Sequence, residues 1–488
     1  MENTTSQSEV IETPQVIEAV QPGEVVHPKE TSSLKYVIIL AVSAGFAGLL
    51  YGYDTVSISG AITYLTALWN LGTGIQGLIV SSIMIGGIVG VGVSGFISDR
   101  VGRKPVLLSG AILFFFAAIW SALAMNPGTL IAARIVGGLG IGLSSSQAIT
   151  YITECAPAKN RGFLSSMYQF LCTIGILLTN IINFFIAAKG GIHSDFANQA
   201  WRWMLAIGAL PALVLVFALV LMPESPRFLL QRGHKAAGMR VLERINGPEA
   251  AQREAKAIEK SLEDDKKGSF RDLFRSPLSY ALGIGIFLAL CNQLVGQNAI
   301  FYYAPTIFSS IFPGGNTAFL CSAITGTVNV LATILGLYMI DRIGRKPLMM
   351  SGALGMCMFY VLMGLSMMFH WNGVLTLVFA CMVIVSFAYS MGPITWVMVS
   401  ELFPTYMRGR AAGFCTMFTW AANFLVAQLT PAMMTNWGGW TFIFWAVFDF
   451  LAFLGVRLFV PETKGRTLEQ IQSFWTNKQH AKKHELVA

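Results

Sequence analysis

Long apolar segments alternate with short polar stretches from residue 35 to residue 460. A helix that crosses a bilayer needs about 20 apolar residues, and twelve segments of this chain meet that requirement. They lie at 35–60, 77–98, 105–125, 128–151, 162–187, 202–222, 278–302, 317–340, 347–369, 373–399, 409–434 and 439–460. The pattern predicts an all-α membrane protein with twelve transmembrane helices.

The composition supports this class and argues against others. Of the 488 residues, 54% are hydrophobic and only 12% are charged, whereas a soluble domain carries about 25% charged residues. The seven cysteines and six histidines are scattered and have no metal-ligand or disulfide spacing. We therefore expect no metal site, no cofactor and no enzymatic activity.

The net charge of +8 is explained by the placement of Lys and Arg. These residues concentrate in alternate loops, with Lys189 and Arg202 as exceptions. Because cytoplasmic loops are enriched in Lys and Arg, both termini are predicted to be cytoplasmic, and no nucleic acid partner is expected. The predicted outer loops contain no Asn-x-Ser/Thr sequon, which favours a bacterial plasma membrane.

Three landmarks of the first half of the chain recur about 240 residues later. They are the segments 99–105 and 341–347, Glu154 with Arg161 and Glu401 with Arg408, and the segments 223–227 and 461–465. Two related halves that enclose a site are the design of many transporters. We expect a disordered polar tail without a signal peptide at 1–33, a six-helix bundle at 34–222, amphipathic cytoplasmic linker helices at 223–275, a second six-helix bundle at 276–460 and a cytoplasmic tail at 461–488.

An ionisable residue, Asp54, lies within the first apolar segment. A carboxylate at the centre of a bilayer costs about 2.5–3.5 kcal/mol, so such a residue faces protein or water and is a functional candidate. Burial favours its neutral form and a nearby cation favours its charged form, so it can exchange a proton as its surroundings change. The alternative is a structural Asp that is hydrogen-bonded to a neighbouring helix.

Several motifs together resemble the sugar porter family of the major facilitator superfamily. They are Gly-Tyr-Asp-Thr at 52–55, Asp-Arg-x-Gly-Arg-Lys at 99–104 and 341–346, Ala-Arg-Ile-Val-Gly-Gly at 133–138, Pro-Glu-Ser-Pro-Arg at 223–227 and Pro-Glu-Thr-Lys-Gly at 461–465. The resemblance extends from about residue 35 to 470. The stretches 48–61, 81–95, 151–154 and 392–396 are most similar to bacterial arabinose-type pentose–proton symporters. The resemblance to the family implies the major facilitator fold.

The resemblance also implies a set of sugar-binding residues. They are Tyr51, Gln169, Asn292, Gln293, Asn298, Tyr302, Asn329, Trp396, Trp420 and Asn423. Amides both donate to and accept from sugar hydroxyls, and aromatic faces cover apolar sugar surface. The alternatives are interhelical hydrogen bonding for each amide and ordinary packing for each Trp. Asn292 and Thr419 depart from the family pattern, which argues against identical hexose recognition.

In proton-coupled members of the family, the residue at the position of Arg134 pairs with the residue at the position of Asp54. The resemblance thus implies that Asp54 and Arg134 couple proton and sugar movement; the alternative is a static ion pair. It further implies a gating network of salt bridges that holds the halves together at the cytoplasmic side. Its members are Asp99, Arg100, Glu154, Arg161, Glu224, Arg227, Asp341, Arg342, Glu401 and Arg408.

The sequence therefore predicts a monomeric transporter in the lipid bilayer that imports a monosaccharide by proton symport. The substrate is expected to be a pentose (L-arabinose, D-xylose or both), with D-galactose as a further candidate. A uniporter of the same fold is the nearest alternative, and the pair Asp54 and Arg134 argues against it. A sugar sensor is another, although the tail after 461 is shorter than the extensions typical of such receptors. Asp449 and Arg457, in the last apolar segment, are not explained by the family pattern.

Overall fold

The regular elements of the protein are helical throughout the described residues. The computed structural model describes residues 34–157, 160–190, 194–265, 270–275, 278–312, 316–403 and 407–462. Twelve spans in this part of the chain are long and apolar enough to cross a membrane. The predicted class, an all-helical protein with twelve transmembrane helices, is confirmed. The predicted tail at 1–33, and the predicted tail at 461–488 beyond residue 462, lie outside the described residues.

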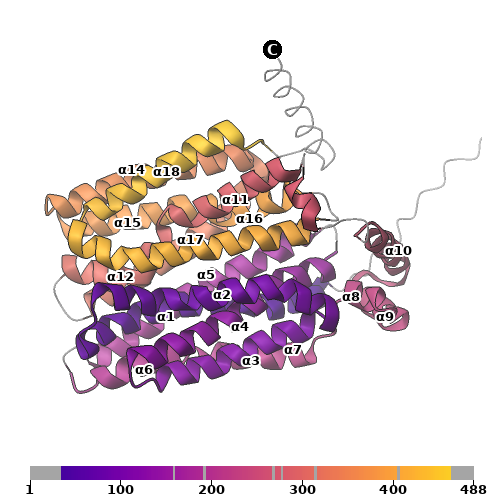
Figure 1. The fold of residues 1–488 in the computed structure, drawn as a ribbon, viewed down its shortest axis with the longest axis horizontal. Helices are drawn as coiled ribbons and strands as arrows, with labels where there is room; N and C mark the ends of the chain where they lie inside the picture. Colours follow the sequence, from indigo (N-terminus) through magenta and orange to yellow (C-terminus); the bar gives the residue numbers. More distant parts are fainter. Residues whose placement is uncertain are drawn as a thin grey trace, which may run out of the picture.

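The first six spans occupy one side of the bundle, from indigo to magenta in Figure 1. They are α1 (Leu34–Trp69), α2 (Thr73–Val101), α3 (Arg103–Ala122), α4 (Pro127–Cys155), α5 (Arg161–Lys189), and α6 (Ala197–Ala206) with α7 (Ala209–Leu221). The chain reverses between α2 and α3 at Gly102, whose φ of 107° suits glycine because it has no Cβ. Gly344, with a φ of 110°, does the same in the second copy of this motif.

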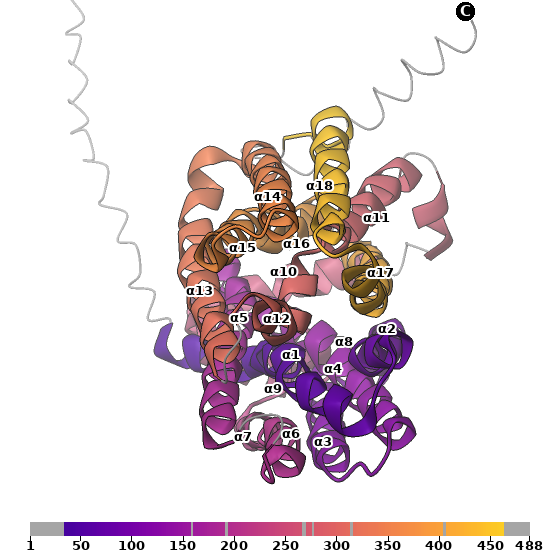
Figure 2. The same cartoon turned by 90° about the vertical axis from the view of Figure 1, so that its left-hand side faces the viewer.

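The last six spans occupy the other side. They are α11 (Leu278–Leu294) with α12 (Gln297–Ile311), α13 (Thr317–Ile343), α14 (Arg345–Met368), α15 (Gly373–Ala388) with α16 (Met391–Glu401), α17 (Arg408–Trp437) and α18 (Trp440–Phe459). Figure 2, a view turned by 90°, shows the two groups facing each other. They meet where α1 contacts α12, α2 contacts α17 and α5 contacts α13.

Short helices connect the two groups at one end of the bundle (Figure 1). They are α8 (Pro226–Gln231), α9 (Lys235–Asn246), α10 (Pro248–Asp265) and the 3₁₀ helix η2 (Phe270–Phe274). Leu230, Leu242, Ala251 and Ala255 pack together as a small core of their own. We call the opposite end of the bundle the far end.

The seventh span is broken. The sequence predicts one helix at 278–302, whereas the structure has two, separated at Gly296 and continuing to Ile311. Gly296 has a φ of 75°, a left-handed conformation that other residues adopt only at a cost of about 1–2 kcal/mol. Broken membrane helices commonly line substrate sites in transporters, because their free backbone groups need partners. The break separates Gln293 on α11 from Asn298 on α12.

Candidate functional site

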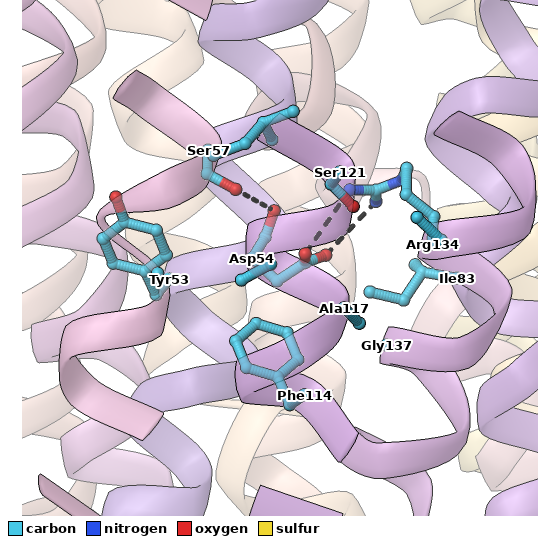
Figure 3. A pocket seen from close by; sticks show the side chains of 13 residues that line it. Tyr53, Asp54, Ser57, Ile83, Phe114, Ala117, Ser121, Arg134 and Gly137 are labelled. Carbon is cyan, nitrogen blue, oxygen red and sulfur yellow. Dashed lines mark hydrogen bonds and ion pairs between the residues drawn. The ribbon is translucent and has the colours of Figure 1, made fainter. Parts of the chain in front are cut away.

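A buried ion pair joins α1 to α4 near the middle of the first group of helices. Arg134 donates from Nη2 to Oδ2 of Asp54 at 3.2 Å and from Nη1 to Oδ1 at 3.4 Å. The two side chains are 2% and 13% exposed. Figure 3 shows both contacts as dashed lines. Two hydrogen bonds between two charged groups form a strong, oriented pair.

Arg134 has further partners on α2, and these do not depend on Asp54. Its Nε donates to the carbonyl oxygen of Ile79 at 2.8 Å, and its Nη2 donates to that of Val80 at 3.4 Å. The guanidinium therefore stays hydrogen-bonded if Asp54 loses its charge. The ion pair can open from the α1 side while Arg134 remains on the α2 and α4 side.

A small cavity adjoins the ion pair. Tyr53, Asp54, Ser57, Ser121 and Arg134 are among the residues that line it. Its volume is about 10 Å³, about the space that one water molecule occupies. The carboxylate thus faces a space suited to a proton donor or acceptor of the size of water.

The other side of Asp54 faces the second group of helices. Tyr51, Asp54, Tyr302 and Trp420 line a second pocket, which is too narrow to hold a water molecule. The rings of Tyr51 and Trp420 lie 5.4 Å apart, centroid to centroid. Asp54 therefore lies between the water-sized cavity and three of the aromatic residues that the sequence assigns to sugar binding.

Asn423 of α17 connects these aromatic residues. Its Nδ2 donates to the hydroxyl of Tyr302 at 2.8 Å and to that of Tyr51 at 3.4 Å. Its Oδ1 accepts from Nδ2 of Asn298 at 3.2 Å. One amide thus joins α1, α12 and α17 at the contact between the two groups of helices.

The network continues across the break in the seventh span. Nδ2 of Asn298 also donates to Oε1 of Gln293 at 2.6 Å, and Gln293 donates to Oδ1 of Asn292 at 2.7 Å. Asn292 in turn donates to the carbonyl oxygen of Met391 at 2.9 Å, where the tenth span is also broken. The two broken spans are therefore linked by amides.

The structure brings together seven of the ten residues assigned to the sugar. The three that these hydrogen bonds and ring contacts do not include are Gln169 on α5, Asn329 on α13 and Trp396 on α16. Asn329 is buried, whereas Gln169 and Trp396 are partly exposed. The role of all ten residues in sugar binding remains a prediction.

Sequence reasoning missed two glutamines. Gln297 is 2% exposed, and its Nε2 has no hydrogen-bond partner in the described part of the chain. It directly precedes Asn298, which the resemblance assigns to sugar binding, so its position offered a signal. Gln428 of α17 carried no such signal.

Gln428 joins the two groups of helices near the far end. Its Nε2 donates to the carbonyl oxygen of Gly74 at 3.0 Å, and its Oε1 accepts from the hydroxyl of Ser81 at 2.9 Å. Close by, the hydroxyl of Tyr303 donates to the carbonyl oxygen of Ala427 at 2.7 Å, within the second group. The contact between α2 and α17 is therefore polar as well as apolar at this end.

The charged groups near α8 differ from the expected network. The arginine that pairs with Glu154 is Arg103, with Nε 3.1 Å from Oε2, and Arg103 also lies 3.4 Å from Asp99. Arg100, which the sequence assigned to the network, is exposed. Gly102 reverses the chain, so that Arg103 at the start of α3 faces the other helices. The place of Arg100 in the network remains a prediction.

The second copy of the motif shows the same difference. Arg345 pairs with Glu401 at 3.4 Å, whereas Arg342 is exposed and lies over the ring of Tyr338 at 4.0 Å. Among the described side chains, the ion pairs of this region join residues of one group of helices to each other or to Arg227 of α8. The side chains of three predicted members, Arg161, Asp341 and Arg408, lie outside the described part of the structure.

Glu224 and Arg227 belong to the first of these clusters. Glu224 accepts hydrogen bonds from the backbone N–H groups of Arg103 at 3.1 Å and Lys104 at 3.2 Å. Burial raises the pKa of Glu224, and these backbone donors partly oppose that shift. Arg227 lies 4.0 Å from Glu154.

The fold and the site together define a class of protein. Two groups of six spans enclose a polar, aromatic site at their contact, next to a buried carboxylate and between broken helices. This is the architecture of a secondary transporter in the membrane.

The chain belongs to the sugar transporter family, because the family model described as "Sugar (and other) transporter" matches residues 40–475. It is 46% identical over 445 residues to the arabinose-proton symporter of Bacillus subtilis, covering 91% of this chain and 96% of that one. It is 34% identical over 476 residues to the D-xylose-proton symporter of Escherichia coli, covering 90% and 96%. The structure is similar to a partially occluded, inward open form of the xylose transporter XylE from E. coli, with a TM-score of 0.80, 33% identity, and 89% and 100% coverage.

Proposed function

We propose that the protein imports a monosaccharide by proton symport with alternating access. The observation that carries the proposal is the position of Asp54, between the water-sized cavity and the pocket lined by Tyr51, Tyr302 and Trp420. A protonation site and a sugar site that share one side chain can influence each other directly. The substrate is a pentose, L-arabinose or D-xylose or both, as the names of the relatives suggest, with D-galactose as a further candidate.

Protonation of Asp54 is the step that links the two ligands. Neutral Asp54 no longer attracts the guanidinium of Arg134, which keeps its bonds to the carbonyl groups of Ile79 and Val80. The segment of α1 at Asp54 is then free to move relative to α4. Tyr51 lies one turn earlier on α1, so the same movement changes its contacts with Asn423 and Trp420.

The sugar replaces hydrogen bonds that the amides now make to one another. Asn423, Asn298, Gln293 and Asn292 form a chain in which each amide serves as donor or acceptor. A sugar hydroxyl can take either role, so it can be inserted into this chain with little loss of hydrogen bonding. Trp420 and Tyr51 supply the apolar surface.

We propose that the charged clusters near α8 fasten helix ends within each half. The ion pairs between the halves that the sequence predicts then form in the state that is open at the far end. Such pairs bias two states of similar energy, although each exposed pair contributes little by itself.

The protein is a multi-pass membrane protein, and we propose that both termini and α8–α10 are cytoplasmic because the basic loops lie at that end. The membrane is the bacterial plasma membrane, the protein is monomeric, and the proton is the co-transported ion. A facilitative uniporter is the second candidate. It is favoured if the pair of Asp54 and Arg134 is static.

External pH, measured in lightly buffered, de-energised cells that express the protein, tests the proposal. L-Arabinose, D-xylose, D-galactose and D-glucose are added in turn. We expect alkalinisation with the transported pentose in the wild type and in Asp195→Asn, a matched change at an exposed carboxylate. Sugar entry without alkalinisation in the wild type would refute symport and leave a uniporter. No entry of any of the four sugars would refute the substrate class.

A further inference from the structure

Asp449 on α18 is a second buried carboxylate that the site above does not use. Asp449 is 0% exposed, and neither its Oδ1 nor its Oδ2 has a hydrogen-bond partner among the described residues. Arg457, two turns later, is exposed and does not pair with it. Among the described residues, the titratable groups next to Asp449 are Cys291 of α11 and Cys357 and Tyr360 of α14.

None of these neighbours supplies a positive charge. An isolated carboxylate in an apolar interior is so costly that the group takes up a proton instead. Asp449 is therefore neutral in this arrangement of the helices. To release its proton it needs a hydrated or rearranged environment.

Other buried polar groups without partners lie around Asp449. Thr441, Trp445 and Asp449 follow each other at four-residue spacing and so share one face of α18. Oγ1 of Thr441, Nε1 of Trp445 and the hydroxyl of Tyr360 have no hydrogen-bond partner within the described residues. Buried polar groups are normally paired or bound to ordered water. The row starts near Trp440, at the far end of the bundle, and leads inward to Asp449.

Trp445 links this row to the break in the seventh span. A Cβ added at Gly296 would lie 2.5 Å from Cγ and 2.6 Å from Cδ2 of Trp445. The indole thus packs directly against the left-handed residue that separates Gln293 from Asn298. Asp449 lies one turn further along α18, so Trp445 lies between Asp449 and that break.

The repeat sets Asp449 apart from Asp54. A shift of about 240 residues moves Asp54 to the region of Gly296, not to α18. The second half thus has no carboxylate at the position that corresponds to Asp54. Its buried carboxylate, Asp449, lies near that position, with Trp445 between Asp449 and Gly296.

We propose that Asp449 is a second proton-binding site, which exchanges its proton with water along the row from Thr441 and is coupled to the break at Gly296. The step is a simple protonation: the carboxylate of Asp449 accepts a proton from hydronium and becomes a carboxylic acid, and water is released. Its part in sugar transport rests on the proposed function, but the existence of the site does not.

Infrared spectroscopy of the full-length protein in lipid vesicles, without sugar, tests the site. The carbonyl stretching band of a protonated carboxylic acid is followed from about pH 5 to about pH 10, a range in which an ordinary Asp, with a pKa of about 3.9, is ionised. We expect such a band in Asp54→Asn that is absent from Asp54→Asn/Asp449→Asn and that decreases toward alkaline pH. Asp449→Glu keeps the acid and should shift the band rather than remove it, which covers the case in which the Asn variant does not fold. Asp195→Asn should leave it unchanged.

Two results would overturn the proposal. A spectrum that Asp449→Asn and Asp449→Glu leave unchanged would show that Asp449 is ionised. A band that belongs to Asp449 but is constant over the whole pH range would show a permanent structural acid. Because no sugar is present, failure of the proposed transport function would leave these spectra unaffected, and the two failures are distinguishable.

Discussion

The two arginines of the motif at 99–105 offer a sharp test of the structure, because they lie three positions apart in one loop region. We predict that Arg103→Gln strongly destabilises the protein, whereas Arg100→Gln does not. Arg103 is 6% exposed and Arg100 is exposed. The two variants remove the same charge from the same end of the bundle.

The magnitude follows from the contacts of Arg103. Loss of one partner of a buried ion pair costs about 3–5 kcal/mol, because the other charge is left uncompensated. Among the described side chains, Glu154, with a side chain 10% exposed, then keeps Arg227 at 4.0 Å and the hydroxyl of Ser225. Asp99 is 61% exposed, so its pairing adds little. We therefore expect a loss of about 3–4 kcal/mol for Arg103→Gln, and less than about 0.5 kcal/mol for Arg100→Gln, as for surface changes in general.

Heating the purified protein in detergent, with size-exclusion chromatography of what remains folded, measures the difference. We expect a midpoint several degrees lower for Arg103→Gln and an unchanged midpoint for Arg100→Gln. Equal shifts in the two variants, or a larger shift for Arg100→Gln, would refute the placement of Arg103 inside the bundle.

Three further predictions concern the contact between the halves and the break at Gly296. Gln428→Ala removes two hydrogen bonds that join α2 to α17, together worth about 1–3 kcal/mol. Spin labels at the far ends of these helices should report that the population with separated ends increases roughly five- to 150-fold relative to the population with closed ends. An unchanged distance distribution would contradict this. Gly296→Ala places a Cβ against Trp445 and forces a left-handed Ala, so sugar affinity in equilibrium dialysis should fall at least about tenfold, the equivalent of about 1.4 kcal/mol; wild-type affinity would show that the break tolerates a side chain. Asn423→Leu removes the amide that donates to Tyr302 and one of the two acceptors of Asn298. It should reduce affinity by a similar factor without changing the pH dependence of transport; a change confined to the pH dependence would argue against a sugar contact.

The spans could be predicted from sequence because the length of an apolar segment is set by the thickness of the bilayer. The pair Asp54 and Arg134 could also be predicted from sequence, since few charged residues lie in apolar segments and each is costly there. Asp54 and Arg134, which come from segments far apart in the sequence, are indeed 3.2 Å apart.

Other features depend on local geometry that a pattern does not record. The choice between Arg100 and Arg103 is decided by the reversal at Gly102, and the break at Gly296 is decided by one left-handed residue within an apolar run. Gln428 resembles any other polar residue of a helix until α2 is placed beside it. The isolation of Asp449 likewise appears only when its surroundings are known.

Sugar accumulation in vesicles tests the central claim, that Asp54 couples the proton to the sugar, most directly. A membrane potential of 100 mV acting on one proton supplies about 2.3 kcal/mol, enough for about fifty-fold accumulation of a neutral sugar. With an imposed potential and pH gradient, the wild type and Asp195→Asn should concentrate the pentose. Asp54→Asn should exchange labelled for unlabelled pentose but not concentrate it. Accumulation by Asp54→Asn to the wild-type level would contradict the account.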